Sequence, residues 1–307
     1  MKRVVALVIA ILLATALITL VSSAAADKKL RVVTTITDLT ELAKAVGGDL
    51  AEVDTLTRGS QDAHEAEIRP TMMLKLRRAD VLIENGLDFD AWADNAASGA
   101  NNPNIVRGAV GRIDVSRGLP ILEVPTDRVD RSGGDVHPLG NPHYSLDPGL
   151  AAPITHSILD VFSRLATDSR PTFEHNRQAF LERLDEAMAR WTKTLEPFHG
   201  AKVAVYNRQW VYFLNRFGLV QAAMLEDPPG IPASSSHLVR VVQQMKAEGI
   251  KIIVAEPWND RKLVERVARE ADAKALVLAS RVGSVKGADS YIGAIDYNVN
   301  ELSRALR

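Results

Sequence analysis

One long amphipathic helix is the feature of this sequence that most constrains its fold. Between Pro171 and Leu195 apolar residues recur at three- and four-residue spacing, with charged residues outside that stripe. At ~1.5 Å per residue the helix would be about 37 Å long, which is longer than one small domain needs. Short β-branched runs alternate with helical stretches on both sides of it. The sequence therefore predicts two compact units joined by a rigid strut.

The alternation on each side of this helix predicts the fold class. Strands are expected at about 30–35, 51–56 and 80–84, and after the long helix at 202–206, 220–225, 250–255 and 274–278. Helices are expected at about 38–46, 69–78, 89–97 and 148–167, then at 210–217, 235–248, 260–271 and from 289. Strands separated by helices of this length form mostly parallel sheets. We therefore expect an α/β protein with two Rossmann-like lobes and a ligand cleft between them, beyond the carboxyl ends of the strands.

We expect four segments along the chain. These are a signal peptide at 1–26, an N-terminal α/β lobe at 27–168, a linker helix at 169–198 and a C-terminal α/β lobe at 199–307. The first helix is expected to begin with Asp38 as its N-cap and to end at Gly47-Gly48. The two lobes share a rhythm of elements but no residue-level repeat.

The first 26 residues have the pattern of an export signal. A charged start at Lys2-Arg3 precedes an apolar run and a small-residue end at Ala24-x-Ala26, so cleavage after about Ala26 is expected. An uncleaved membrane anchor is the alternative, because the run is near the lower length for crossing a bilayer. The chain has no cysteine, which excludes disulfides and a lipidated cysteine. We therefore expect a periplasmic protein that is not a lipoprotein.

The charge of the chain indicates no bulk electrostatic partner. Removing residues 1–26 takes away two basic residues and no acids, so the formal net charge changes from -1 to -3. No long block of like charge follows, so neither nucleic acid nor an anionic membrane surface is indicated.

The stretch Asp135–Pro148 has the composition of a ligand loop. It contains His137 and His143 with two carboxylates, and a glycine and prolines exclude regular helix or strand pairing. Its backbone shape is therefore set by turn chemistry, and such a loop can hold a metal. The alternative is a surface crossing with incidental histidines.

Several strand ends also supply donor groups. His64 follows the strand at 51–56, and Asn207, Glu226 and Glu256 follow strands of the second lobe. Two histidines with an oxygen donor suit a borderline ion such as zinc, at about 2.0 to 2.1 Å from each nitrogen. The alternative is that each histidine is an ordinary capped loop residue.

Motifs along nearly all of the mature chain resemble one known family. They are Asp62-Ala-His64 through Pro70, Leu74-Lys-Leu-Arg-Arg-Ala-Asp80, Glu84-Asn-Gly-Leu87, Asn141-Pro-His143-Tyr-Ser-Leu-Asp147-Pro148, Tyr206-Asn207-x-x-Trp210-x-Tyr212-Phe213, Arg216-Phe217-Gly218-Leu219, Pro229-Gly-Ile-Pro232 and Tyr291 to Leu302. In order and spacing they are similar to the zinc- and manganese-binding solute receptors of bacterial ABC importers, the zinc-uptake and treponemal receptor family. The resemblance implies two α/β lobes tied by one long helix.

The resemblance also implies a ligand set for a metal, zinc first and manganese next. The first two ligands fall on His64 and His143, the third on Asn207, and the frequent fourth, an aspartate, falls near Ala279. Asparagine is a weaker, neutral donor than imidazole or carboxylate. We therefore predict a site of His64, His143, Asn207 and Glu226, with Glu256 or Glu67 as other sources of the missing charge.

The loop before His143 also departs from the family. Relatives often have a histidine-rich segment there, whereas this chain has only His137, with Asp127, Asp130 and Asp135.

The resemblance implies a binding protein and not an enzyme. It would capture the metal as cargo and deliver it to a permease and an ATPase on other chains, since this sequence has no Gly-x-x-x-x-Gly-Lys phosphate loop. We expect a monomer. One alternative is a family member with a degenerate site that binds a chelated metal, another small ligand or a partner protein. A less favoured one is a zinc hydrolase with Glu65 or Glu226 as general base, against which no His-Glu-x-x-His motif is present.

Overall fold

The computed structural model describes residues 29–64, 66–126, 137–226 and 230–307. The expected signal peptide lies outside these ranges, as do Glu65, Asp127, Asp130 and Asp135. Within the ranges, no helix is both long enough and apolar enough to span a membrane.

The N-terminal lobe is built on a four-stranded parallel sheet in the order β2-β1-β3-β4. Its strands are β1 (Leu30–Thr34), β2 (Ala51–Thr55), β3 (Val81–Glu84) and β4 (Arg112–Asp114). Its helices are α2 (Thr37–Gly47), α3 (Pro70–Arg77), α4 (Trp92–Ala100) and α5 (Ala151–Leu165). Every residue of β3 is buried, as expected for a central parallel strand covered on both faces.

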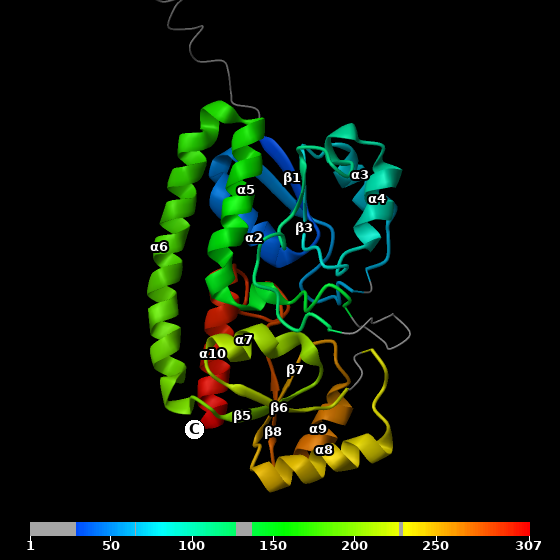
Figure 1. The fold of residues 1–307 in the computed structure, drawn as a ribbon, viewed down its shortest axis with the longest axis vertical. Coiled ribbons are helices and arrows are strands. Elements are labelled where there is room, and N and C mark those ends of the chain that lie inside the picture. The colour runs from blue at the N-terminus through cyan, green and yellow to red at the C-terminus, as the bar shows by residue number, and fades with distance from the viewer. Residues whose placement is uncertain (1–28, 65, 127–136, 227–229) are drawn as a thin grey trace, which may run out of the picture.

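The C-terminal lobe repeats this arrangement with a parallel sheet in the order β6-β5-β7-β8 (Figure 1). Its strands are β5 (Lys202–Val205), β6 (Val220–Met224), β7 (Ile252–Ala255) and β8 (Lys274–Val277). Its helices are α7 (Val211–Arg216), α8 (Ser235–Glu248), α9 (Arg261–Glu270) and α10 (Tyr291–Leu306). The predicted fold class, two α/β lobes with mostly parallel sheets, is confirmed.

The predicted long helix is also confirmed, as α6 (Arg170–Leu195). Figure 1 shows it running along one side of the molecule past both lobes. Its apolar stripe is buried along its length: Phe173 packs against Phe162 of α5, with ring centroids 5.5 Å apart, and Trp191 donates its indole N–H to Asp296 of α10 at 2.7 Å. One hydrophobic cluster includes residues of both sheets and of α6, so the helix ties the lobes through a shared core.

One prediction from the sequence is wrong, and one strand was not predicted. Asp38 is not the N-cap of α2: the cap position is Ile36, which makes no side-chain cap. Asp38 lies buried in the first turn and accepts hydrogen bonds from Ser145 Oγ and from the Val282 backbone N–H, both at 2.8 Å. Strand β4 was not predicted, because its three residues are too few to show a period.

A segment of the C-terminal lobe lies directly against the N-terminal lobe. Thr37 Oγ1 donates to the Val282 carbonyl at 2.7 Å, and the Tyr291 hydroxyl donates to the Ser145 carbonyl at 2.7 Å. The contact is close, since a Cβ added to Gly59 would lie 2.0 Å from the Val282 carbonyl oxygen. The loop after β8 is therefore placed by the N-terminal lobe as well as by its own sheet.

Candidate metal site between the lobes

Three histidine rings come together on loops of the N-terminal lobe. The ring centroid of His64 lies 5.1 Å from that of His137 and 5.2 Å from that of His143. The centroids of His137 and His143 are 6.2 Å apart. The structure thus brings together the two histidines predicted as ligands and adds a third. The sequence signal for His137 was its place in the ligand loop, six residues before His143.

His64 and His143 are held by the same local device. Asp62 Oδ1 accepts from the backbone N–H and from Nδ1 of His64, both at 2.9 Å. Asn141 Oδ1 accepts from the backbone N–H of His143 at 3.0 Å and from its Nδ1 at 2.9 Å. Because each Nδ1 carries the donated proton, each neutral ring keeps its lone pair on Nε2, the arrangement that second-shell partners give to metal-binding histidines.

The electrostatic surroundings keep His143 neutral. Its burial, together with the charges of His64, His137 and Arg281, lowers the pKa of His143 well below its usual value. Its Nε2 is buried and has no hydrogen-bond partner among the described residues. Burial would raise the pKa of Asp62, but the hydrogen bonds and charge of His64 and the charge of Arg281 lower it to about 2. A neutral imidazole with an unused lone pair and an ionised second-shell carboxylate are what a divalent cation requires.

The spacing of the nitrogens fits a metal only in part. The Nε2 atoms of His64 and His137 lie 3.2 Å apart, and two nitrogens bound tetrahedrally to one zinc would lie about 3.3 Å apart. As the described side chains stand, however, no three His, Cys, Asp or Glu residues form a group that could hold a metal ion. The pair has the required spacing, and a third donor would have to move toward it.

The oxygen donors predicted on the C-terminal side have other contacts. Asn207 Oδ1 accepts from the Gln209 backbone N–H at 3.2 Å and begins a short 3-10 helix, Arg208–Trp210. Glu226 Oε2 accepts from the Gly230 backbone N–H at 3.2 Å. Both bonds lie within the residue's own loop, and Asn207 and Glu226 stay predictions as metal ligands.

Of the other two carboxylates considered, Glu67 is exposed and Glu256 is buried. Glu256 Oε1 accepts from the Trp210 indole N–H at 2.5 Å, and its Oε2 has no hydrogen-bond partner in the described part of the chain. Burial, with the nearby charge of Asp62, raises the pKa of Glu256 to about 8. Its carboxyl group is therefore largely protonated at neutral pH.

Sequence reasoning missed one charged residue next to the histidines. Ala279, near which the family's fourth ligand falls, is buried, and its backbone N–H donates to Asn298 Oδ1 at 2.7 Å. Two residues later Arg281 is only 3% exposed. Its guanidinium carbon lies 5.2 Å from the ring centroid of Phe89, which contacts His64 at 4.4 Å between centroids. The available signal was a single arginine within the apolar segment at 275–282.

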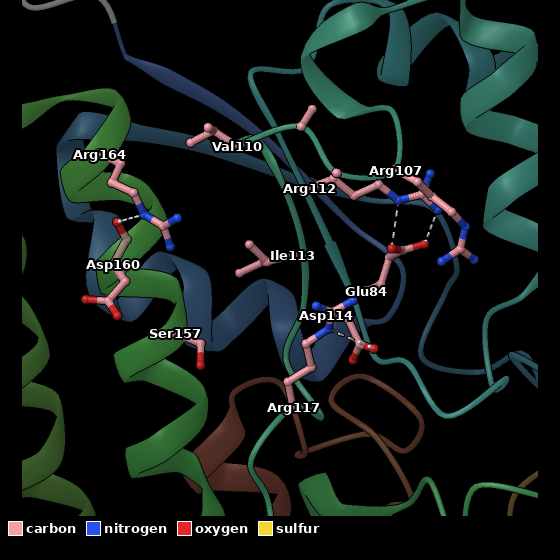
Figure 2. Close-up of a pocket in the computed structure, with 12 residues that line it drawn as sticks. Glu84, Arg107, Val110, Arg112, Ile113, Asp114, Arg117, Ser157, Asp160 and Arg164 are labelled. Atoms are coloured by element: carbon pink, nitrogen blue, oxygen red, sulfur yellow. Dashed lines mark hydrogen bonds and ion pairs between the residues drawn. The ribbon is translucent and has the colours of Figure 1, made fainter.

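A separate cavity of about 420 Å³ in the N-terminal lobe does not compete as a metal site. Figure 2 shows Arg164 and Asp160 on one side of it and the Arg112–Glu84 pair on the other. The described residues that line this cavity include no histidine, and Arg112 binds Glu84 through two hydrogen bonds of 2.8 and 2.5 Å. Because Glu84 is already neutralised, the histidine cluster is the better candidate.

Two α/β lobes, a rigid connecting helix and paired imidazoles at the junction define a two-lobed solute-binding protein of the kind that binds a metal between its lobes. Over residues 32–305 the chain matches the family model described as zinc-uptake complex component A, periplasmic, and it belongs to this family.

Curated relatives agree with this assignment. The zinc-binding lipoprotein AdcA of Streptococcus pneumoniae (strain ATCC BAA-255 / R6) is 25% identical over 99% of this chain, which spans 61% of that relative's length. The high-affinity zinc uptake system protein ZnuA of Bacillus subtilis (strain 168) is 23% identical, with 87% of this chain and 84% of the relative covered. The iron-binding protein YfeA of Yersinia pestis is 22% identical over 91% of this chain and 87% of its own.

Solved structures show the same fold. A crystal structure of ZnuA superposes with a TM-score of 0.78 at 22% identity and covers 91% of this chain and 100% of its own. The manganese-bound periplasmic metal binding protein from Candidatus Liberibacter asiaticus gives a TM-score of 0.76 at 20% identity, with the same coverage. At these identities the likeness establishes architecture, and the cargo must be argued from the residues.

Proposed function

We propose that this protein is a receptor that captures a divalent metal ion between its lobes and delivers it to an ABC importer. Zinc is the first candidate and manganese the second. The observation that carries the proposal is the pair of histidines, His64 and His143, each fixed through Nδ1 so that its Nε2 carries the lone pair that a metal would bind. Membership of the zinc-uptake family supports it, as do relatives named for zinc and for iron.

The nitrogen donors we propose are His64, His143 and His137. Imidazole suits zinc, whereas manganese is better served by carboxylates and water, so three imidazoles favour zinc. His64 uses its Nδ1 proton for Asp62, so in neutral rings His137 donates the proton between the two Nε2 atoms. Binding of metal would replace that proton. Asn207 and Glu226 remain predictions for an oxygen donor from the C-terminal side.

The receptor acts without chemistry of its own and with other chains. We propose that residues 1–26 direct it to the periplasm, where it meets a permease and its ATPase as a monomer. The relative AdcA is named a lipoprotein, whereas this sequence has no cysteine to carry a lipid. The pattern of the first residues supports a cleaved signal in its place.

The proposal is tested by metal content and titration. Protein purified from a periplasmic extract is subjected to elemental analysis, then stripped and titrated with zinc and manganese by calorimetry. We expect one ion per chain, tighter binding of zinc, and a loss of about a hundredfold or more in His143→Ala, since that histidine supplies a ligand. His156→Ala, on the exposed face of α5, is the matched control and should bind like the wild type. Absence of binding at micromolar metal would overturn the proposal.

A further inference from the structure

Arg281 is a buried cation with too few partners. Its Nη1 donates to the Gln61 carbonyl at 3.0 Å, and its Nη2 is buried with no hydrogen-bond partner among the described residues. The guanidinium lies between two aromatic rings, 5.2 Å from the centroid of Phe89 and 5.3 Å from that of Trp258. Guanidinium has five N–H donors, and leaving a buried charged donor unpaired is costly. This environment is therefore suited to an additional acceptor.

Phe89 connects Arg281 to the histidine cluster. The ring of Phe89 meets those of His64 and His143 edge to face, at centroid distances of 4.4 and 5.6 Å. Among the described residues, two buried atoms near this ring have no hydrogen-bond partner, the donor Arg281 Nη2 and the acceptor His143 Nε2. Buried polar atoms in native proteins are normally satisfied, so both atoms are candidates for contact with a bound ligand.

The proposed nitrogen donors bring no negative charge to a bare divalent ion. Three neutral imidazoles add none, and the buried Ala279 after β8 adds none. Asp62 is already bonded to His64, and Asp38 to Ser145 and Val282. A divalent cation bound to the imidazoles would therefore meet the positive charge of Arg281, which already acts on His143, together with the negative charges of Asp62 and Asp38.

We propose that the site takes its metal ion together with a small oxyanion, a carbonate or a carboxylate, which bridges the metal and Arg281. One oxygen of the anion completes the coordination of the metal, and another accepts a hydrogen bond from Arg281 Nη2. The planar fork of guanidinium matches the oxygens of such an anion, and the charge-assisted bond compensates the buried cation. The inference rests on the proposed metal-receptor function and gives the chemical form of its cargo.

The test measures whether metal binding depends on an anion. Metal-stripped protein is titrated with Co²⁺, whose visible spectrum reports the ligands, in a non-coordinating buffer free of carbonate. The titration is repeated with bicarbonate, with acetate and with citrate, after correcting for the metal that each anion binds in solution. Bicarbonate and acetate test an anion recruited from solution, and citrate tests a metal that arrives already chelated. The anion that tightens Co²⁺ binding identifies the source of the bound oxyanion.

Arg281→Gln removes the guanidinium charge, and Arg281→Lys keeps a charge without the fork. Arg117→Gln, at a side chain 83% exposed beside the cavity of the N-terminal lobe, is the control for losing one arginine. Circular dichroism and melting temperature establish that each variant is folded. If Arg281→Gln does not fold, the Arg281→Lys titration and the wild-type spectra still decide the question.

We expect at least one anion to tighten Co²⁺ binding by the wild type about tenfold or more and to change its absorption band, because a charge-assisted bond is worth ~1.5–3 kcal/mol. Arg117→Gln should behave in the same way, Arg281→Lys should retain only part of the effect, and Arg281→Gln should lose it. Wild-type protein that binds Co²⁺ equally well in every buffer overturns the anion subsite and leaves the receptor function standing. Protein that binds Co²⁺, zinc and manganese in no buffer overturns the proposed function and the subsite with it.

Discussion

The same type of backbone turn occurs in both lobes, but its third residue differs between them. In the N-terminal lobe these turns are Asp62-Ala-His64 and Asn141-Pro-His143. In each, the side-chain oxygen of the first residue accepts hydrogen bonds from the backbone N–H and from Nδ1 of the histidine. In Asn207-Arg-Gln209 of the C-terminal lobe the first side chain accepts from the same backbone position, but the third residue is glutamine. The turn alone therefore makes no ligand, and the imidazoles come from one lobe.

The C-terminal lobe contributes two buried ionisable groups in place of imidazoles. Arg281 places a buried guanidinium beside Phe89, and Glu256 places a buried carboxyl group whose pKa is raised to about 8. In the site we propose, the nitrogen donors come from the N-terminal lobe, and the C-terminal lobe adds the buried charge of Arg281. This difference can be tested by changing one lobe at a time.

The largest effect should come from the histidines. We expect His64→Ala to weaken zinc binding about a hundredfold or more, because it removes a nitrogen donor. Glu226→Gln keeps an oxygen donor on the C-terminal side and removes only its charge, so it should weaken zinc binding less than about tenfold, a difference below ~1.4 kcal/mol. Calorimetric titration of stripped protein measures both. Equal losses in the two variants would mean that both lobes supply ligands and would remove the asymmetry.

The next largest effect concerns how the free energy of unfolding depends on pH through Glu256 of the C-terminal lobe. The pKa of Glu256 is raised in the folded protein to about 8, so the folded state retains a proton that the unfolded state releases above about pH 4.5. The stability contributed by this group is complete below that pH and is lost as pH rises toward 8 and beyond. Metal-free wild type should lose a few kcal/mol between pH 5 and 8 relative to Glu256→Gln. Denaturant unfolding at several pH values measures the loss, and parallel curves would contradict it.

Within the N-terminal lobe, Asp62 and Asn141 each orient a histidine through its Nδ1. Asp62→Ala and Asn141→Ala each remove the group that orients a histidine, so zinc affinity should fall about 10- to 100-fold. Asn141→Asp keeps the acceptor for His143 but loses the amide donor to Glu123 Oε2 and to the Arg208 carbonyl, both at 2.8 Å, so it should restore zinc binding only in part. Titration of the three variants tests this, with melting temperature as the control for folding. Unchanged affinity in both alanine variants would show that the turns shape only the loop.

Local pattern predicted much of this fold, and long-range contacts account for what it missed. The strands, the helices and the strut α6 follow from periodicity and turn residues, which a single sequence displays. The role of Asp38 could not be predicted, because its partners Ser145 and Val282 lie 107 and 244 residues away. The same holds for Arg281, whose carbonyl partner Gln61 is 220 residues away. His64 and His143 were predicted as ligands from their places after a strand and in the Asp135–Pro148 loop and from the family motifs, all of which the sequence displays. Each histidine and its Asx partner also lie only two residues apart.

The smallest expected effect distinguishes two roles for Asn207, a helix cap and a metal ligand. Its side-chain oxygen begins the short helix Arg208–Trp210, a capping role, whereas the sequence predicted a metal ligand. A cap alone predicts that Asn207→Ala costs about 1 kcal/mol of stability and leaves zinc affinity unchanged. Asn207→Asp keeps the capping acceptor and should restore stability; if residue 207 also faces the metal, the added charge should tighten binding as well. Denaturant unfolding and zinc titration of both variants decide between the roles. An alanine variant that loses affinity at unchanged stability would extend the ligand set into the C-terminal lobe.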